Sequence, residues 1–329
     1  MAVPRDVDSV RRDAPGRDSS ATAPSEPGGL AGKAPARRRR APSVGRSLWW
    51  FVVPAGVVYA YVVLVPSVQG VWYSFTNWSF GVSSPKFVGF GNFAAIFQGD
   101  AGTAALRTLF IAIAVMVAAN VLGLALALLL NGPVLGRNVL RTIIFSPMVV
   151  SALVVGYLFQ YIFGPPGIGA ANTALHAFGL RQVDFLGNPT SALWIIIISV
   201  VWQFTGGSMI IFLAGLKGVP AELEEAAALD GAGYWRRFWY VVRPLLAPAT
   251  TINLMLGLIG GLKLFDQIFS ITGGGPGGST ETISTLIYKF FSQFGEWAQA
   301  AALAVLLAIA VGILSFIQFW ALRRQERKA

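Results

Sequence analysis

The chain has 329 residues, of which 55% are hydrophobic and 12% are charged, and its formal net charge is +10. Ordinary soluble domains are about 25% charged, so this composition predicts a membrane protein. The sequence contains no cysteine, which excludes disulfides, thiol catalysis and thiolate metal sites.

The first 46 residues are expected to form a disordered, basic, cytoplasmic tail. They are rich in Ala, Pro, Ser, Gly and Arg and hold hardly any large apolar residue, a composition that cannot bury a core. The four arginines at residues 37–40 are also suited to contact with anionic membrane lipid. A cleavable signal peptide is not expected, because the first apolar run starts near residue 48 and is long enough to span a membrane.

Six apolar stretches follow, and each is long enough to cross a hydrocarbon core of about 30 Å, which takes about 20 helical residues. They lie approximately at residues 48–71, 105–130, 142–163, 192–216, 245–269 and 298–322. The expected fold class is therefore an all-α membrane protein with six transmembrane helices, and the membrane domain is expected to occupy residues 47–325.

Lysine and arginine are distributed unevenly among the segments that connect these spans. Of 25 such residues, most lie in the two termini, between the second and third spans, and between the fourth and fifth spans. Because positively charged segments stay on the cytoplasmic side, both termini are expected to be cytoplasmic. The chain is thus expected in the cytoplasmic membrane as a multi-pass protein. Since most of the positive net charge comes from lysines and arginines that this topology explains, the charge does not indicate a nucleic acid partner, and none is expected.

The sequence offers no set of residues that could act together in catalysis. His176 is the only histidine and lies in a predicted external loop, so a histidine metal site lacks a second histidine ligand. A Ser–His pair would need His176 itself, and nothing near it has the form of a nucleophile elbow. The segment TGGGPGGST at residues 272–280 does not fit the phosphate-binding P-loop pattern. Lys263 and Asp266, near the outer end of the fifth span, are expected on one helix face and can serve as interface anchors. We expect no enzyme activity, cofactor or metal site in this chain.

The segment at residues 219–243 is polar and lies between two apolar spans, so it is expected to be a cytoplasmic loop. Pro220 and three glutamates favour a helix start, because the N-terminal end of a helix attracts negative charge. Three alanines extend the helix, and Gly231 or Gly233 is expected to end it in a left-handed conformation. A second helical piece at residues 234–242 is expected to lie in the membrane interface and to end before Pro244. The small residues of the first piece let another backbone approach closely, which favours docking of a cytoplasmic partner.

This loop, EEAAALDGAGYWRRFWYVVRPLLAP at residues 224–248, resembles the EAA loop of the permease subunits of binding-protein-dependent ABC importers. The matching positions are Glu225, Ala226, Ala227, Asp230, Gly231 and Ala232, then Phe238, Val241, Pro244 and Pro248. Arg243 departs from the apolar residue often found there. Three further stretches are similar to sugar permeases of the maltose, glycerol-3-phosphate and lactose branch. They are FVGFGNFAAIF (87–97), VWQFTGGSMIIFLAGLKGVPAEL (201–223) and KLFDQIFSITGGGPGGSTETISTLIY (263–288).

The resemblance implies that the chain is one half of a pore and that the loop, from Glu225 to Ala232, couples it to ATP hydrolysis in a separate subunit. The implied partners are a cytoplasmic ABC ATPase dimer, a second homologous permease and an external sugar-binding protein that delivers a carbohydrate. Transport would be import by alternating access. The alternative is a self-sufficient secondary carrier or channel for a small polar solute, which has no need of such a loop.

The fourth and fifth spans hold the candidate substrate pathway. Its members are Trp202, Gln203, Phe204, Gly207, Gly257, Gly260 and Gly261. A glutamine near mid-membrane must find a hydrogen-bond partner inside the bundle or in a watery cavity, and aromatic faces suit a sugar ring. The resemblance places the three glycines of the fifth span at sugar-contacting positions of maltose permeases, which carry polar or aromatic groups there. Helix packing explains the cluster equally well, because small residues are common at helix interfaces.

Overall fold

The computed structural model describes residues 44–326, with side chains for residues 52–324. The expected tail at residues 1–46 lies outside the described residues except for its last three, which begin the first helix. The chain divides into two units, Met1–Gly56 and Val57–Ala329. The packing described below is that of the second unit.

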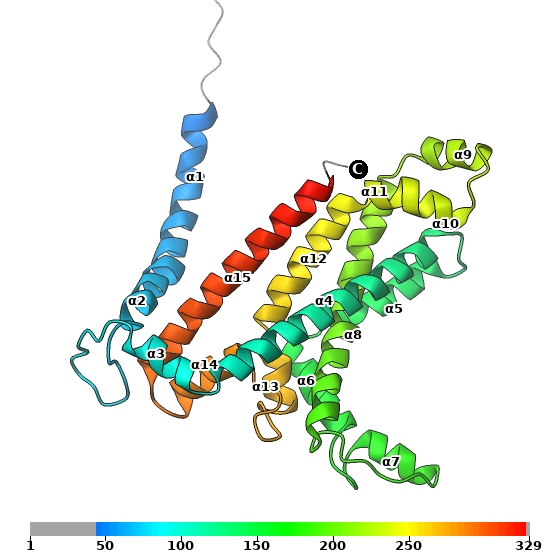
Figure 1. Cartoon of the computed structure of the whole chain (residues 1–329). Coiled ribbons are helices and arrows are strands. Elements are labelled where there is room, and N and C mark those ends of the chain that lie inside the picture. The colour runs from blue at the N-terminus through cyan, green and yellow to red at the C-terminus, as the bar shows by residue number, and fades with distance from the viewer. Residues whose placement is uncertain (1–43, 327–329) are drawn as a thin grey trace, which may run out of the picture. The chain divides into compact units, whose positions relative to one another are not determined.

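The described elements are helices, and among the described residues the extended pairing is limited to one isolated bridge between Thr76 and Phe87. The helical fold class is therefore confirmed. In chain order (Figure 1) the elements are α1 (Val44–Tyr59), the π-helical turn η1 (Ala60–Leu64), α2 (Val65–Tyr73), α3 (Gly91–Gln98), α4 (Ala101–Asn131), α5 (Arg137–Val149), α6 (Ala152–Ile162), α7 (Ala170–Ala177), α8 (Pro189–Lys217), α9 (Ala221–Leu229), α10 (Tyr234–Arg237), the π-helical turn η2 (Phe238–Val242), α11 (Arg243–Leu245), α12 (Ala247–Leu262), α13 (Asp266–Ile271), α14 (Ile283–Ser292) and α15 (Trp297–Glu326).

Four helical segments in the described part of the chain are long and apolar enough to cross a membrane. They are Val52–Tyr73, Ala101–Asn131, Pro189–Lys217 and Trp297–Arg324. Two helix pairs meet the same criterion only together, and each is bent at a short break. α5 and α6 meet at 97°, and Tyr234–Leu245 meets α12 at 70°. The described residues thus hold four continuous candidate spans, or six if each bent pair is one span.

The expected third span is broken between α5 and α6. Pro147 lies inside the last turns of α5, where a proline removes a backbone hydrogen bond and favours a kink. Val150 and Ser151 then adopt extended backbone angles, with ψ of 139° and 136°. The carbonyl oxygen of Val150 accepts a hydrogen bond of 2.8 Å from the side chain of Gln203. The broken backbone is therefore satisfied by a neighbouring helix, as an apolar environment requires.

The expected fifth span is also interrupted, because α12 ends at Leu262 and α13 begins at Asp266. Lys263 is the residue that terminates α12, and Asp266 lies in the first turn of α13. The prediction that these two residues share one helix face is wrong. Each charge instead stands at the helix end that favours it, since the macrodipole attracts a cation to the C-terminus and an anion to the N-terminus.

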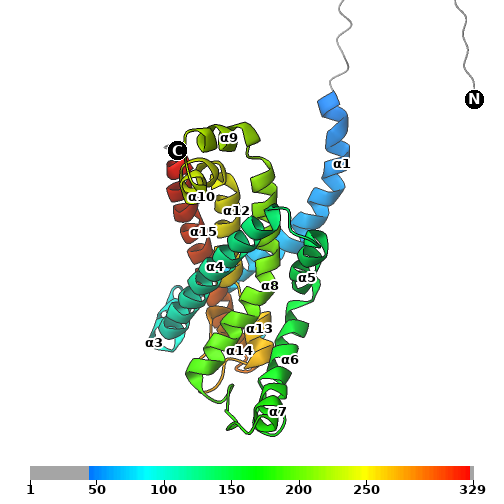
Figure 2. The same cartoon turned by 90° about the vertical axis from the view of Figure 1, so that its right-hand side faces the viewer.

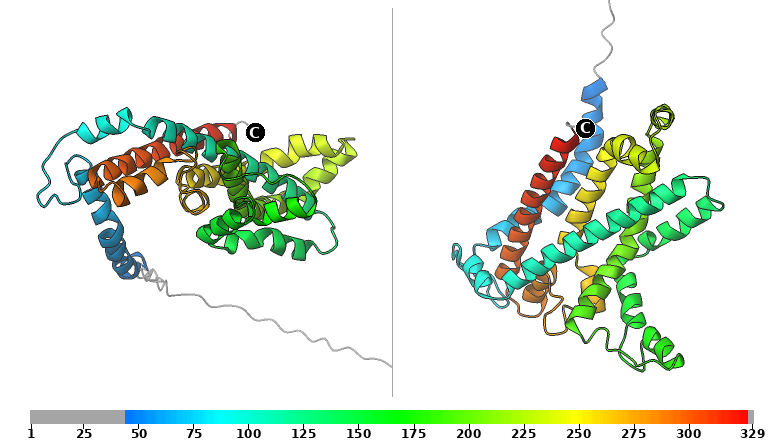
Figure 3. Two further views of the ribbon diagram at one scale, coloured as in Figure 1. Left: turned by 90° about the horizontal axis from the view of Figure 1, so that it is seen from below. Right: turned by 45° about the vertical axis from the view of Figure 1, so that its right-hand side comes forward.

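α8 is the central helix of the second unit. In its membrane-length apolar window 67% of the residues are buried, against 33% in α4 and 22% in α15. α4 crosses α8 and also packs against α12, while α12 contacts α15 (Figures 1 and 2). α6 packs against α13, so the C-terminal parts of the two interrupted spans lie together. The views in Figures 1 and 3 place α9 at one end of these helices and α7 at the other.

Candidate functional site

α9 is the first piece of the loop, and local sequence signals explain its two ends. Pro220 precedes it in an extended conformation, and Glu222 and Glu224 lie in its first turn. Gly231 has a left-handed φ of +80°. Its backbone N–H donates to the carbonyl of Ala228 (3.0 Å), and the N–H of Ala232 donates to the carbonyl of Ala227 (2.9 Å). This pair of bonds is a Schellman motif, so Gly231 and not Gly233 ends the helix.

The core of this chain does not explain why α9 is helical. None of its residues is buried, and Leu229 is 90% exposed. Helices shorter than about 12–15 residues are marginal in water without packing partners. Glu225 and Ala226 are exposed, Ala227 is half-buried, and Asp230 is exposed at the C-terminal end. The helix thus presents most of its surface to whatever lies beyond this chain.

The second piece of the loop is anchored in the chain's own core. Phe238 and Val242 are buried, and they belong to the hydrophobic cluster that includes Leu216 and Leu246. The prediction that this helix ends before Pro244 is wrong. It continues through the π-helical turn η2 to Leu245, and the proline is tolerated because it stands in the first turn of α11, where its missing N–H costs little.

The two pieces enclose a groove of about 410 Å³. Its lining includes three of the candidate coupling residues, Ala227, Asp230 and Ala232. The opposite wall carries Arg236 and Arg237, and the Nε atom of Arg237 is buried without a hydrogen-bond partner. Among the described residues the only ion pair joins Glu281 to Lys289, far from this loop in sequence. The carboxylates of the loop and the guanidinium groups of Arg236 and Arg237 thus form no ion pair with the described residues, while Arg243 lies over the ring of Trp239.

A cavity of about 360 Å³ lies among α4, α5, α8 and α12. Five of the seven candidate pathway residues line it, namely Phe204, Gly207, Gly257, Gly260 and Gly261. The structure thus brings together most of the residues that the sequence analysis selected from the fourth and fifth spans.

The other two candidates, Trp202 and Gln203, do not line this cavity. Gln203 is buried, and besides its bond to Val150 it accepts a hydrogen bond of 2.7 Å from the amide of Gln267. Its partner therefore lies inside the bundle, which was one of the two expected environments. The ring of Trp202 lies 5.7 Å from that of Phe159, between ring centroids. Both residues join α8 to the interrupted spans.

The glycines of the cavity differ in what they permit. A Cβ atom at position 261 would lie 2.6 Å from the Cα atom of Ala112, so Gly261 lets α12 approach α4 closely. A Cβ atom at position 260 would meet no atom within 4 Å, so Gly260 leaves open space. Helix packing therefore explains Gly261, whereas Gly260 contributes to the width of the cavity.

The cavity also holds polar side chains that the sequence analysis did not select. Asn120 donates its amide to the carbonyl of Met116 at 2.7 Å, and its Oδ1 atom is buried without a partner. Asn253 donates to the carbonyl of Ser208 at 3.2 Å. A buried polar atom without a partner is costly, and Oδ1 of Asn120 is buried beside the cavity rather than exposed to it. The available signal was an asparagine inside an otherwise apolar stretch.

Comparisons with known proteins agree with this architecture. The family described as the inner membrane component of binding-protein-dependent transport systems matches residues 119–329. "Probable starch degradation products transport system permease protein AmyD" of Thermoanaerobacterium thermosulfurigenes is 34% identical over 281 residues, covering 84% of this chain and 94% of the relative. "Multiple sugar-binding transport system permease protein MsmF" of Streptococcus mutans is 34% identical over 275 residues, covering 82% and 93%.

A solved structure shares the fold. It is a chain of a bacterial ABC transporter involved in the import of the acidic polysaccharide alginate, and it aligns with a TM-score of 0.74 at 24% identity. The alignment covers 85% of this chain and 96% of that one. Candidate membrane spans and the family match together indicate a multi-pass protein of the plasma membrane. The chain belongs to the family of inner membrane components of binding-protein-dependent transport systems.

Proposed function

We propose that this chain is the permease subunit of an ATP-driven ABC importer that moves a sugar or oligosaccharide across the cytoplasmic membrane by alternating access. Family membership supports the importer class. The carbohydrate class is supported by relatives named for starch degradation products, multiple sugars and lactose. ATP hydrolysis is assigned to a separate ABC ATPase dimer, so this chain supplies the pore and not the catalysis.

The observation that carries the coupling role is the exposure of α9. Its helix signals are complete, yet it buries no residue in this chain. The second piece of the loop is anchored by Phe238 and Val242, which holds α9 at the end of the helices. An exposed helix on a fixed support is suited to transmit movement of a docked subunit. We assign the contact with the ATPase to Glu225, Ala226, Ala227, Asp230, Gly231 and Ala232.

The cavity among α4, α5, α8 and α12 is assigned to the sugar. The ring of Phe204 offers an apolar face, and the lining also includes the polar residues Asn120, Ser208 and Asn253. The bent pair of α5 and α6 exposes large apolar side chains, including Val149 and Val154, that a second homologous permease or lipid would cover. An external sugar-binding protein would deliver the substrate to the end of the molecule opposite α9.

The coupling role is tested with Glu225→Lys and Gly231→Asp in the assembled importer. Both variants are expected to insert into the membrane but to lose sugar uptake and ATPase association. The first reverses an exposed charge of the loop, and the second places a side chain where φ is +80°. Asp100→Lys is the matched control, because this exposed carboxylate makes no capping bond and lies at the N-terminus of α4. Full transport by both loop variants would refute the coupling role.

A further inference from the structure

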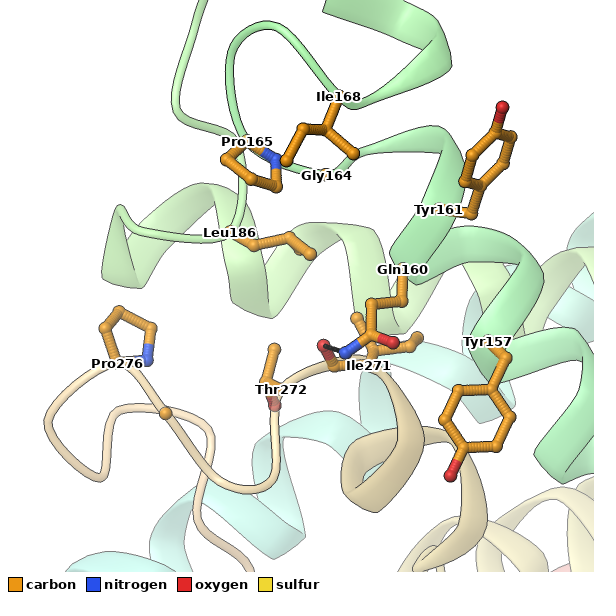
Figure 4. A pocket seen from close by; sticks show the side chains of 11 residues that line it. Tyr157, Gln160, Tyr161, Gly164, Pro165, Ile168, Leu186, Ile271, Thr272 and Pro276 are labelled. Carbon is orange, nitrogen blue, oxygen red and sulfur yellow. Dashed lines mark hydrogen bonds between the residues drawn. The ribbon is translucent and has the colours of Figure 1, made fainter.

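A second cleft, of about 620 Å³, lies between the C-terminal part of α6 and the chain that follows α13 (Figure 4). We call it the outer cleft, because it lies at the end of the molecule opposite α9. Tyr157, Gln160 and Tyr161 of α6 form one side, and the turn from Thr272 to Pro276 forms the other. Its volume is within the range of about 300–1,000 Å³ that is typical of small-molecule sites.

Both walls of the outer cleft are fixed by buried hydrogen bonds. Asn172 is fully buried, and its amide donates to the carbonyls of Gly164 (3.0 Å) and Val183 (2.9 Å). On the opposite wall the hydroxyl of Thr280 donates to the carbonyl of Gly275 at 2.7 Å. A site whose walls are held before binding loses less conformational entropy when a ligand enters. The outer cleft is therefore a preformed site.

The α6 side of the cleft presents two tyrosine rings and an amide. Tyr157 is 51% exposed and Tyr161 is 63% exposed, one helical turn apart. Figure 4 shows their rings diverging above and below Gln160. The Gln160 amide makes a single long hydrogen bond, 3.4 Å to the carbonyl of Ile271, and its oxygen accepts none from the described residues. Each tyrosine offers an apolar face with a polar edge, which matches a sugar ring, whose C–H faces are bordered by hydroxyl groups.

The charges of the residues that line the outer cleft and the cavity limit the class of ligand that either space can bind. Among the described residues that line the outer cleft, none is charged, and the same holds for the cavity among α4, α5, α8 and α12. A carboxylate or phosphate would enter either space without a cation to offset its desolvation, which is costly. The alginate importer, which shares the fold, is described as importing an acidic polysaccharide. The uncharged lining here favours a neutral ligand.

We propose that the outer cleft is a binding subsite for a neutral saccharide, which occupies it between release from the external binding protein and entry into the cavity. This inference rests on the proposed function. Tyr157 and Tyr161 stack on sugar rings, and the Gln160 amide bonds hydroxyl groups. Acidic saccharides are excluded from the subsite because none of the described residues that line it has a basic side chain.

The absence of cysteine from the chain gives a direct test. The assembled importer is prepared with Tyr161→Cys and exposed to a fluorescent maleimide, with maltose, maltotriose, trehalose, lactose or an oligouronate present. Labelling of this chain is resolved by electrophoresis. At least one neutral sugar is expected to slow labelling, and the oligouronate is not. Phe178→Cys is the matched control, because Phe178 is 82% exposed and lies outside both the cleft and the candidate membrane spans, so no sugar should protect it.

Uptake by the unmodified importer is measured with the same sugars, because this measurement tests the proposed function separately from the proposed subsite. For a sugar that is taken up, Tyr157→Ala is expected to raise KM about two- to twelvefold, the value of one aromatic stacking contact, with little change in maximal rate. Phe178→Ala should leave KM and the maximal rate unchanged. ATP-driven uptake without protection of position 161 would overturn the subsite and leave the proposed function standing. Equal protection by the oligouronate would overturn the neutral-ligand assignment. If no sugar is taken up and no sugar protects position 161, both proposals are overturned.

Discussion

Replacing Gly261 with alanine tests how closely α12 packs on α4, and Gly260→Ala is the matched control. A Cβ atom at position 261 would lie 2.6 Å from the Cα and 2.9 Å from the Cβ of Ala112. Carbon atoms in van der Waals contact are about 3.5–4.0 Å apart, so the two helices would have to separate by about 1 Å. Overpacking of this kind costs about 1–3 kcal/mol. At position 260 the new methyl group meets no atom within 4 Å, so it costs no strain.

Both substitutions also replace glycine within a helix, which is favourable by about 0.5–1 kcal/mol. This gain is common to the two variants and cancels when they are compared. The free energy of unfolding of Gly261→Ala is therefore expected to be about 1–3 kcal/mol lower than that of Gly260→Ala, which corresponds to about 5- to 150-fold in the unfolding equilibrium constant.

The assay is reversible unfolding of the purified chain in mixed detergent micelles, followed by far-ultraviolet circular dichroism while the denaturing detergent is increased. Gly260→Ala is expected to unfold at or slightly above the midpoint of the unmodified chain, and Gly261→Ala below the midpoint of Gly260→Ala. Equal midpoints for the two variants would refute the close approach of α12 to Ala112. Equal midpoints would also remove the distinction between Gly261, which allows close helix packing, and Gly260, which leaves open space in the cavity.

Three further changes test the cavity, the interrupted spans and the loop. Gln203→Leu leaves the carbonyl of Val150 and the amide of Gln267 without their hydrogen-bond partner. It is therefore expected to lower the free energy of unfolding by about 1–3 kcal/mol in the same titration. The double variant with Gln267→Leu should cost less than the sum of the single changes, and strict additivity would contradict their hydrogen bond. Gly260→Leu narrows the cavity and is expected to lower uptake without lowering stability; unchanged uptake would argue against passage there. Phe238→Ala removes a core anchor and is expected to cost about 3–5 kcal/mol and to weaken ATPase copurification. Phe178→Ala, at an exposed position outside the loop, should resemble the unmodified chain.

The loop could be predicted from sequence because its signals are local. Glutamates at the helix start, alanines in its body and a glycine at its end act over a few residues, and the structure has α9 ending at Gly231. The continuation through Pro244 was missed, because the π-helical turn that brings this proline into a helix start depends on anchoring by Phe238 and Val242.

The interruptions of the third and fifth spans could not be read from hydropathy. An apolar stretch has the same mean hydropathy whether its backbone is continuous or broken. The break at Val150 is satisfied by Gln203, which lies 53 positions later in the chain, so its partner is set by tertiary packing. Gln203 itself was assigned to the substrate pathway because a polar residue at that depth fits either a cavity or a helix contact.

The cavity was predicted in part. The cluster of aromatic, polar and small residues in the fourth span suggested Phe204 and Gly207, and the resemblance to maltose permeases suggested the glycines of α12; all of them line the cavity. Trp202 and Gln203 are neighbours of Phe204 in sequence but point to other helices, because successive residues of a helix face different directions. Asn120 was not selected because an asparagine in an apolar span can simply bond between helices, although it lines the cavity.

The central claim is that this chain works as one subunit of an ATP-driven importer. The most direct measurement is purification of the tagged chain from its native membrane in a gentle detergent, with mass spectrometry of the proteins that accompany it. The proposed function predicts a second homologous permease and an ABC ATPase, and it predicts that the Glu225→Lys variant loses the ATPase but keeps the second permease. Recovery of the chain alone, still able to transport a solute into liposomes without ATP, would contradict it and favour a self-sufficient carrier.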